Sequence, residues 1–212
     1  MPELTAYVKI AVALFVLVNP LEGVPIFLAR TRRLGAAERL RIARTAAISV
    51  TIIMLTAFFV GRWLLAMLGI STGAFQIAGG ILVLLIGLQM VLGEPHESKP
   101  AEEAAAAGNF AIVPLAIPLL AGPGVIGSII IYSTRGALGS GPSAAGDVIL
   151  CAILLAVGLA TWGALRAADP LRRLLGDTGI DVATRVAGLI VAAIAVEMMH
   201  SGILGLFPRL AG

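Results

Sequence analysis

The sequence is poor in charged residues, histidine and cysteine. Only 13% of its 212 residues are charged, against roughly 25% in soluble domains, and 59% are apolar. The single cysteine, Cys151, excludes a disulfide within one chain and a cysteine-based metal site. The two histidines and the lack of a dense carboxylate cluster argue against a metal centre, and no nucleophile elbow, phosphate loop or zinc motif is present. We therefore expect no enzymatic activity and no resident metal or cofactor.

What the sequence has instead is long apolar runs, with a mean hydropathy of +1.02. A soluble fold of this length could not hide so much apolar surface, whereas lipid tails can cover it. One membrane crossing needs about 20 mainly apolar residues. Six segments qualify: Ala6 to Leu28, Ala43 to Leu65, Thr72 to Leu92, Phe110 to Tyr132, Val148 to Arg166, and Arg185 to Phe207. They predict an all-α, polytopic membrane protein with six transmembrane helices in the lipid bilayer, with a turn at 69–73 and a loop before Arg185.

Basic residues predict the orientation of these spans, because cytoplasmic loops carry an excess of lysine and arginine. The net charge of +3 comes from short basic clusters between apolar runs, so it does not indicate nucleic-acid binding. Two arginine clusters and Lys99 fall on one side of a six-span chain: Arg30, Arg32, Arg33, Arg39, Arg41 and Arg44, then Arg166, Arg172, Arg173 and Arg185. The other side has Lys9, Arg62, Arg135 and Arg209. This asymmetry predicts that both termini lie outside.

The two halves of the chain carry similar features in the same order. Val18–Val24 in the first span parallels Ala121–Val125 in the fourth, and Ile77–Ile81 in the third parallels Val186–Ile190 in the sixth. Because each half has three spans, the second half enters the membrane from the opposite face. The halves, 1–93 and 110–212, are therefore predicted to form two inverted three-helix repeats with broken first helices, an architecture of many secondary transporters. A flexible cytoplasmic linker, 94–109, joins them.

Proline and glycine interrupt the first span of each predicted repeat. Pro20 lies about 21 Å into its span at 1.5 Å per residue, and Pro123 occupies the matching place in the fourth span. Proline lacks an N–H and clashes with the preceding turn, so both helices are expected to break in the hydrocarbon region. A helix that begins at that depth offers free N–H groups and a positive dipole end, which can hold a carboxylate. The alternative is a pair of kinks that serve only packing. The interruptions predict substrate-binding residues: Asn19, Pro20, Glu22, Gly23, Ala121, Gly122, Pro123 and Gly124.

Polar side chains at membrane depth give a second set of candidates. Ionisable groups inside a bilayer cost several kcal/mol and usually mark a pathway or a site. Gln76 and Glu197 are predicted to line the substrate cavity with Asn19, and Glu22 or Glu197 to take a substrate ammonium or a coupling proton. Two alternatives stay open: Glu22 caps the second half-helix at the interface, or Glu197 is a protonated structural group. Small residues at Gly69/Gly73, Ala183/Ala187 and Gly188/Ala192 predict that spans three and six pack in the bundle interior.

At these residues the chain resembles the MarC family of bacterial inner-membrane proteins, which includes neutral amino acid transporters. The resemblance covers nearly the whole chain. It is carried by three blocks: Asn19–Leu28, Ile77–Gly80, and Pro114–Ile126 with its Ala-Gly-Pro-Gly sequence. The stretch Gly179–Gly188 also matches.

The resemblance implies a six-span inner-membrane protein that transports glycine, alanine, serine or threonine, with no enzymatic activity. Three positions depart from the pattern expected of relatives: position 22 is Glu where a small or polar residue is usual, position 76 is Gln instead of Arg, and position 197 is Glu instead of Gln. These departures leave open the substrate and the coupling ion, H⁺ or Na⁺, and the sequence does not give the direction of transport. The sequence also leaves open a homo-oligomer, an exporter of another metabolite or drug, and a scaffold or sensor without flux.

Overall fold

The computed structural model describes residues 2–31, 34–93, 121–136 and 143–207, and all regular structure within these ranges is α-helical. The helices are α1 (Pro2–Val18), α2 (Pro20–Thr31), α3 (Ala36–Leu68), α4 (Thr72–Leu92), α6 (Pro123–Arg135), α7 (Ala144–Arg166) and α8 (Ala168–Leu206). The predicted linker, 94–109, and residues 110–120 of the predicted fourth span lie outside the described residues. The all-helical class is confirmed for the described part of the chain.

Four of the described helical stretches are long and apolar enough to cross a membrane. They are Ala36–Leu68, Thr72–Leu92, Ala144–Arg166 and Thr178–Leu206, and Thr5–Val18 is a shorter apolar helix. The second, third, fifth and sixth predicted spans thus each correspond to a long helix. The first span is divided between α1 and α2, and of the fourth only the part from Ala121 onward is described.

The division between α1 and α2 falls at Asn19, as the sequence predicts. The Asn19 N–H still donates to the Phe15 carbonyl at 3.0 Å, but its φ of 42° lies in the left-handed region. Proline at position 20 cannot donate a helical hydrogen bond, and it disfavours helical geometry in the residue before it. Asparagine tolerates the left-handed conformation better than most residues, so the chain turns at Asn19 and restarts as α2.

The turn between α3 and α4 also falls where glycine and serine predict it. Gly69 ends α3 with φ 67°, and the Gly69 N–H and Ile70 N–H donate to carbonyls of the last α3 turn. Ser71 then caps α4, because its hydroxyl oxygen accepts a hydrogen bond from the Ala74 N–H at 3.2 Å. A left-handed glycine followed by a serine cap reverses the chain within three residues.

The loop predicted before Arg185 is wrong, because helix α8 already begins at Ala168. Pro170 is compatible with this start, since a missing N–H costs nothing in the first turn of a helix. The interruption falls instead at Gly176, whose φ of 67° and ψ of 173° lie outside helical values and kink α8. The apolar part of α8 therefore begins at Thr178 rather than at Arg185.

Helices α4 and α8 pack side by side in opposite directions, and glycines set their separation. A Cβ added at Gly80 would lie 2.9 Å from the Ala195 carbonyl oxygen, and one at Gly87 would lie 2.8 Å from the Ala192 nitrogen. Gly73 meets Gly202 in the same way. The small residues recur every seven positions, at 73, 80 and 87 on α4 and at 188, 195 and 202 on α8. This spacing keeps them on one face of each helix, where close backbone approach replaces side-chain burial.

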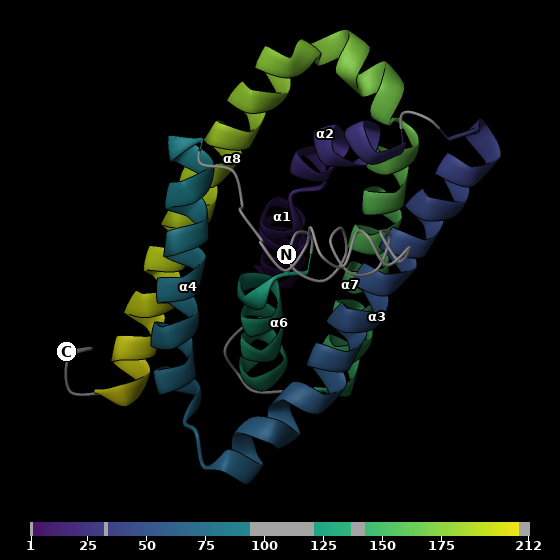
Figure 1. Cartoon of the computed structure of the whole chain (residues 1–212). Coiled ribbons are helices and arrows are strands. Elements are labelled where there is room, and N and C mark those ends of the chain that lie inside the picture. Colours follow the sequence, from purple (N-terminus) through teal and green to yellow (C-terminus); the bar gives the residue numbers. More distant parts are fainter. Residues whose placement is uncertain (1, 32–33, 94–120, 137–142, 208–212) are drawn as a thin grey trace.

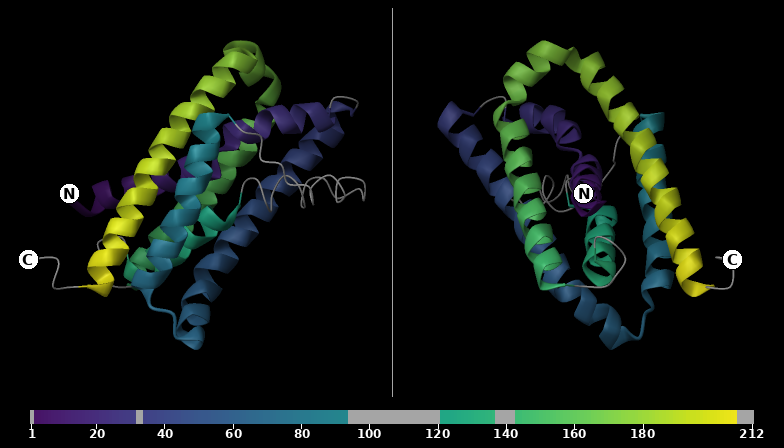
Figure 2. Two further views of the ribbon diagram at one scale, coloured as in Figure 1. Left: turned by 60° about the vertical axis from the view of Figure 1, so that its left-hand side comes forward. Right: turned by 180° about the vertical axis from the view of Figure 1, so that it is seen from behind.

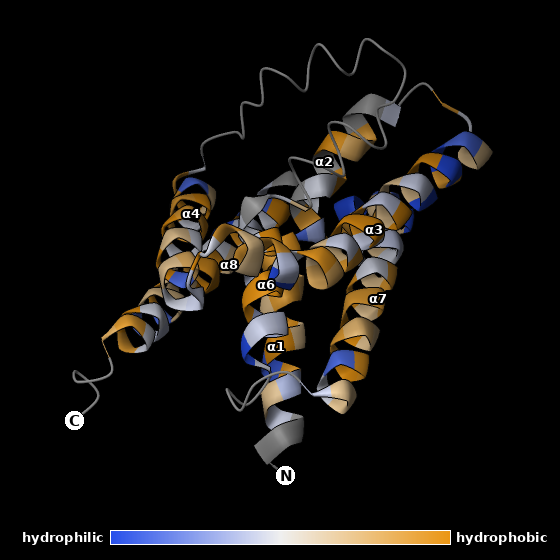
Figure 3. Cartoon of the chain, turned by 90° about the horizontal axis from the view of Figure 1, so that it is seen from below, coloured by the Kyte–Doolittle hydropathy of each residue, from blue (hydrophilic) through white to orange (hydrophobic). Residues whose placement is uncertain are grey.

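Figures 1 and 2 show the pair α4 and α8 on one side of the molecule, the pair α3 and α7 on the other, and α1 and α6 between them. Spans three and six thus pack against each other, but not in the bundle interior as predicted: only 33% of the α4 window and 22% of the α8 window is buried. Their outer faces are apolar (Figure 3), with Leu85 52% and Leu189 60% exposed. Lipid tails are the medium that such faces require.

Two ion pairs tie α3 to the second half of the chain at opposite ends of the bundle. The guanidinium of Arg39 lies 3.0 Å from the Asp169 carboxylate, and that of Arg62 lies 3.1 Å from the Asp147 carboxylate. Arg39 belongs to the first arginine cluster, and Asp169 lies beside the second. The two clusters therefore fall at one end of the bundle, as predicted; that this end is cytoplasmic stays a prediction.

Candidate functional site

A cavity of about 930 Å³ lies between α1, α4, α6 and α8. Its walls on α6 and α8 are single helix faces: Ser128, Ile131, Tyr132 and Arg135 on α6, and Ile194, Glu197, Met198 and Ser201 on α8. The i, i+3, i+4, i+7 spacing in both sets is that of residues on one side of a helix. Helix α1 supplies residues between Thr5 and Ala13, and α4 supplies Gln76.

One residue of the cavity lining carries an unsatisfied side-chain oxygen. Gln76 is only 2% exposed, and its side-chain Oε1 has no hydrogen-bond partner in the described part of the chain. Leaving a buried polar atom unpaired costs about 1 to 3 kcal/mol, so such an atom calls for an explanation. Nearby, the Ser128 hydroxyl donates to the Gly124 carbonyl at 2.8 Å and lies 3.7 Å from the Met198 sulfur. Gln76 is thus the lining residue that a hydrogen-bonding ligand would satisfy.

The charged groups of the cavity come from three helices. Lys9 of α1 and Arg135 of α6 supply cations, and Glu197 of α8 supplies the carboxylate. The Arg135 guanidinium donates to the Ser201 carbonyl at 3.5 Å, which holds it at the end of α6. The Glu197 side chain is 78% exposed and lies 4.0 Å from the His200 imidazole. A lining with both signs of charge suits a small dipolar solute better than an apolar one.

Of the predicted site residues whose side chains the structure describes, two line this cavity, Gln76 and Glu197. The described residues of the interruptions are packed instead: Asn19 is 5% exposed and Ala121 1%, and Pro20, Gly23, Gly122 and Gly124 are buried. A Cβ at Gly124 would come within 2.9 Å of the Val83 side chain, so the first turn of α6 packs closely against α4. Helix α6 begins at Pro123, and Glu22 lies in α2, but the structure does not describe these two side chains. The substrate-binding role of all these residues stays a prediction.

Sequence reasoning missed six polar lining residues: Thr5, Lys9, Ser128, Tyr132, Arg135 and Ser201. Lys9 and Arg135 were used only to predict orientation, as residues at the outer ends of their spans. The available signal was spacing, because Ser128, Tyr132 and Arg135 lie four and three residues apart and so share a face of α6. No spacing within one segment indicates that this face meets Gln76 and Glu197.

Within the ranges that the structure describes, no group of three or more His, Cys, Asp or Glu side chains could hold a metal ion. The only acidic lining residue of the cavity among these is Glu197. The cavity therefore offers hydrogen-bond acceptors, hydroxyl groups and opposed charges rather than a cluster of metal ligands.

The backbone at Asn19 gives a direct test of the interruption. Replacing Asn19 with valine should lower the free energy of unfolding by about 1 to 3 kcal/mol, because a β-branched residue is strained at positive φ. Glycine at the same position adopts this φ without strain, so Asn19→Gly should stay closer to the parent. Thermal unfolding in detergent measures both variants. Equal losses for the two would show that side-chain contacts of Asn19, and not its backbone, matter.

The fold and the cavity define an integral membrane helical bundle, and the comparisons place it in a family. The family model described as "MarC family integral membrane protein" matches residues 4–207, and the chain belongs to this family. It is 40% identical to the UPF0056 membrane protein YhcE of Escherichia coli over 98% of this chain and 96% of the relative. It is 36% identical to a UPF0056 membrane protein of Pyrococcus abyssi (96% and 97% covered) and to the inner membrane protein MarC of Citrobacter koseri (91% of each). No solved structure matches the chain.

Proposed function

We propose that the protein is a secondary transporter of small neutral amino acids, such as glycine, alanine, serine and threonine, and that the cavity is its substrate vestibule. The observation that carries this proposal is the joining of an unpaired buried Gln76 oxygen, two cations and one carboxylate in a single cavity. An amino acid zwitterion has an ammonium group for Gln76 and Glu197 and a carboxylate for Lys9 and Arg135.

The size of the cavity supports a small solute. Ligand pockets usually measure about 300 to 1,000 Å³, so 930 Å³ leaves room for an amino acid together with water. A lining that combines polar groups with apolar side chains such as Ile131 and Ile194 suits a zwitterion with a short side chain. Water in the vestibule would also solvate Glu197, which is costly to ionise against lipid.

Cross-packing of the two halves supports alternating access through inverted repeats. Helix α2 packs on α7 and α8, and its counterpart α6 packs on α3 and α4. The paired helices α3 and α7 run in opposite directions, as do α4 and α8 (Figure 1). Each half thus holds the broken helix of the other, an arrangement in which one half can rock against the other. On this proposal both termini lie on the periplasmic side, the protein carries no enzymatic activity, and Glu22 or Glu197 couples transport to H⁺ or Na⁺.

Uptake of labelled glycine or alanine into proteoliposomes tests the proposal. We expect saturable uptake that responds to a proton or sodium gradient and that unlabelled serine inhibits. Protein-free liposomes and liposomes with heat-unfolded protein are the controls. If folded protein shows no saturable flux of any of these amino acids under either gradient, the proposal is wrong. Export of another metabolite, or a scaffold without flux, would then be the function to pursue.

A further inference from the structure

The cavity ends before it reaches either helix interruption. Its lining stops at Ala13 on α1 and at Ser128 on α6. Asn19 and Gly122 each lie six residues further inward, about 9 Å along a helix axis. Both interruptions therefore lie at a similar depth beyond the closed end of the cavity.

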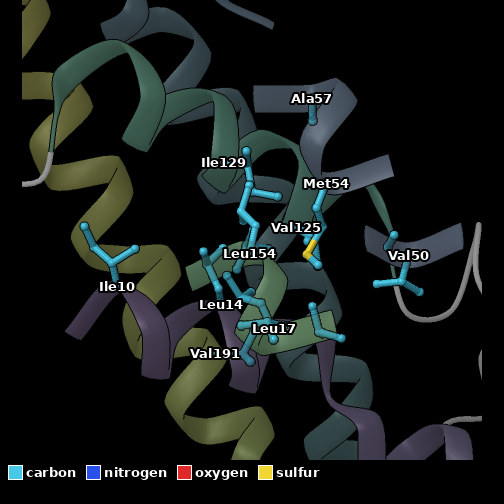
Figure 4. Packing of buried hydrophobic residues seen from close by; sticks show 14 of the residues in the cluster. Ile10, Leu14, Leu17, Val50, Met54, Ala57, Val125, Ile129, Leu154 and Val191 are labelled. Carbon is cyan, nitrogen blue, oxygen red and sulfur yellow. The ribbon is translucent and has the colours of Figure 1, made fainter. Parts of the chain in front are cut away.

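The space between is filled by an apolar layer, made of Leu14, Leu17, Val125, Leu154 and Val191. Leu14, Leu154 and Val191 are 0% exposed, Val125 is 3% and Leu17 is 7%. The order of residues along the chain puts Leu14 and Leu17 between Ala13 and Asn19, and Val125 between Gly122 and Ser128. Figure 4 labels all five among the packed side chains of the core, and all five belong to one buried cluster.

The polar groups that face this layer are few. On the cavity side, Ser128 is the lining residue of α6 that lies nearest the layer along the helix, and Gln76 is a second buried polar lining residue. On the other side is Asn19, which is buried beside the start of α2. A dry aliphatic layer between two polar zones blocks ions and polar solutes because they cannot keep their hydration within it.

We propose that this apolar layer is the closed gate of the transport pathway, which separates the cavity from the interruptions at Asn19 and Gly122. The gate opens when the four helices that supply the layer, α1, α6, α7 and α8, separate. The proposal rests on the proposed function for its meaning, but its test measures access of a reagent and needs no flux. A failure of amino acid uptake and a failure of the gate are therefore distinguishable.

Thiol accessibility tests the gate. The native thiol is removed with Cys151→Ala, and a single cysteine is placed in the cavity with Ser201→Cys, a partly exposed lining position, or beyond the layer with Ala121→Cys. A membrane-impermeant methanethiosulfonate is added to right-side-out and to inside-out membrane vesicles. Ser201→Cys should react rapidly from one face, and Ala121→Cys should react much more slowly from that same face.

The truncation Leu14→Ala should then open the layer. It should raise the reaction rate of the Ala121→Cys protein from the cavity face by about tenfold or more. The truncation removes packing that only the closed state has, so it destabilises the closed state and increases the population of the open state. Leu165→Ala is the matched control. Leu165 is 1% exposed, but it lies at the C-terminal end of α7, away from Leu154 of the layer. The control should leave the rate unchanged, and both proteins should elute as folded, monodisperse material.

Three results would overturn the proposal. The first is Ala121→Cys reacting as fast as Ser201→Cys with Leu14 intact. The second is a rate that Leu14→Ala does not change, or that Leu165→Ala raises equally. The third is Ser201→Cys failing to react from either face, which would show that water does not fill the cavity.

Discussion

Replacing Gly87 with leucine should prevent α4 from packing against α8 and abolish recovery of folded protein. A Cβ at Gly87 would lie 2.8 Å from the Ala192 nitrogen and 3.0 Å from the Gly188 carbonyl oxygen, so even the first added carbon meets backbone. Backbone cannot rotate away as a side chain can, and the leucine side chain adds three further carbons. We expect a loss of at least about 3 kcal/mol in the free energy of unfolding. Fluorescence-detected size-exclusion chromatography after a heating series measures it.

Gly163 provides the matched control for this prediction. It lies in α7, and a Cβ there would meet nothing within 4 Å. Gly163→Ala should therefore raise stability by about 0.5 to 1 kcal/mol, the usual gain when alanine replaces glycine inside a helix. Gly87→Leu protein that melts like the parent would contradict the close α4–α8 contact.

Replacing Gln76 with leucine should reduce amino acid uptake by at least about tenfold while the protein stays folded, as expected when a site loses a hydrogen bond worth more than about 1.4 kcal/mol. Leucine has nearly the volume of glutamine but offers no acceptor to the ligand. Because the Gln76 Oε1 has no partner in the described structure, its removal should leave stability unchanged or higher. A lost structural hydrogen bond would instead lower both stability and uptake.

Gln89 is the control for this substitution. It lies on the same helix, α4, but is exposed and does not line the cavity. Gln89→Leu should keep uptake within about twofold of the parent, the range usual for surface substitutions. Initial rates at several glycine concentrations separate a loss of affinity from a loss of turnover. Equal uptake by Gln76→Leu and parent protein would remove Gln76 from the substrate site.

The local signals in the sequence predict much of this fold. Proline at position 20 and glycine at positions 69 and 122 act on the neighbouring backbone through φ, steric clash and missing N–H groups, so their effects fall where the residues are. The interruption at Asn19, the turn at Gly69 and the start of α6 at Pro123 are therefore confirmed. The loop before Arg185 is wrong because one glycine, Gly176, and not the charged stretch as a whole, interrupts the helix.

The cavity could not be predicted in the same way, because it depends on how helices cross. Gln76 and Glu197 are adjacent only through the antiparallel register of α4 and α8, which glycines at seven-residue spacing set. Lys9 on α1 and Arg135 on α6 stand in different halves of the chain, and both line the cavity only because these helices lie beside the α4–α8 pair. Depth along a span, which the sequence does indicate, does not say which face of the helix a side chain occupies.

The packing of each half against the other has a consequence for biogenesis. The main neighbours of α3 are α6 and α7, and those of α4 are α6 and α8, so within the described residues none of the first four helices packs extensively against another of the four. They must remain as separately inserted helices, exposed to lipid, until the second half of the chain has been synthesised. The bundle can close only when α8 arrives and its glycine face meets that of α4. Chains that stop short of α8 should therefore be substrates for membrane quality control rather than smaller working proteins.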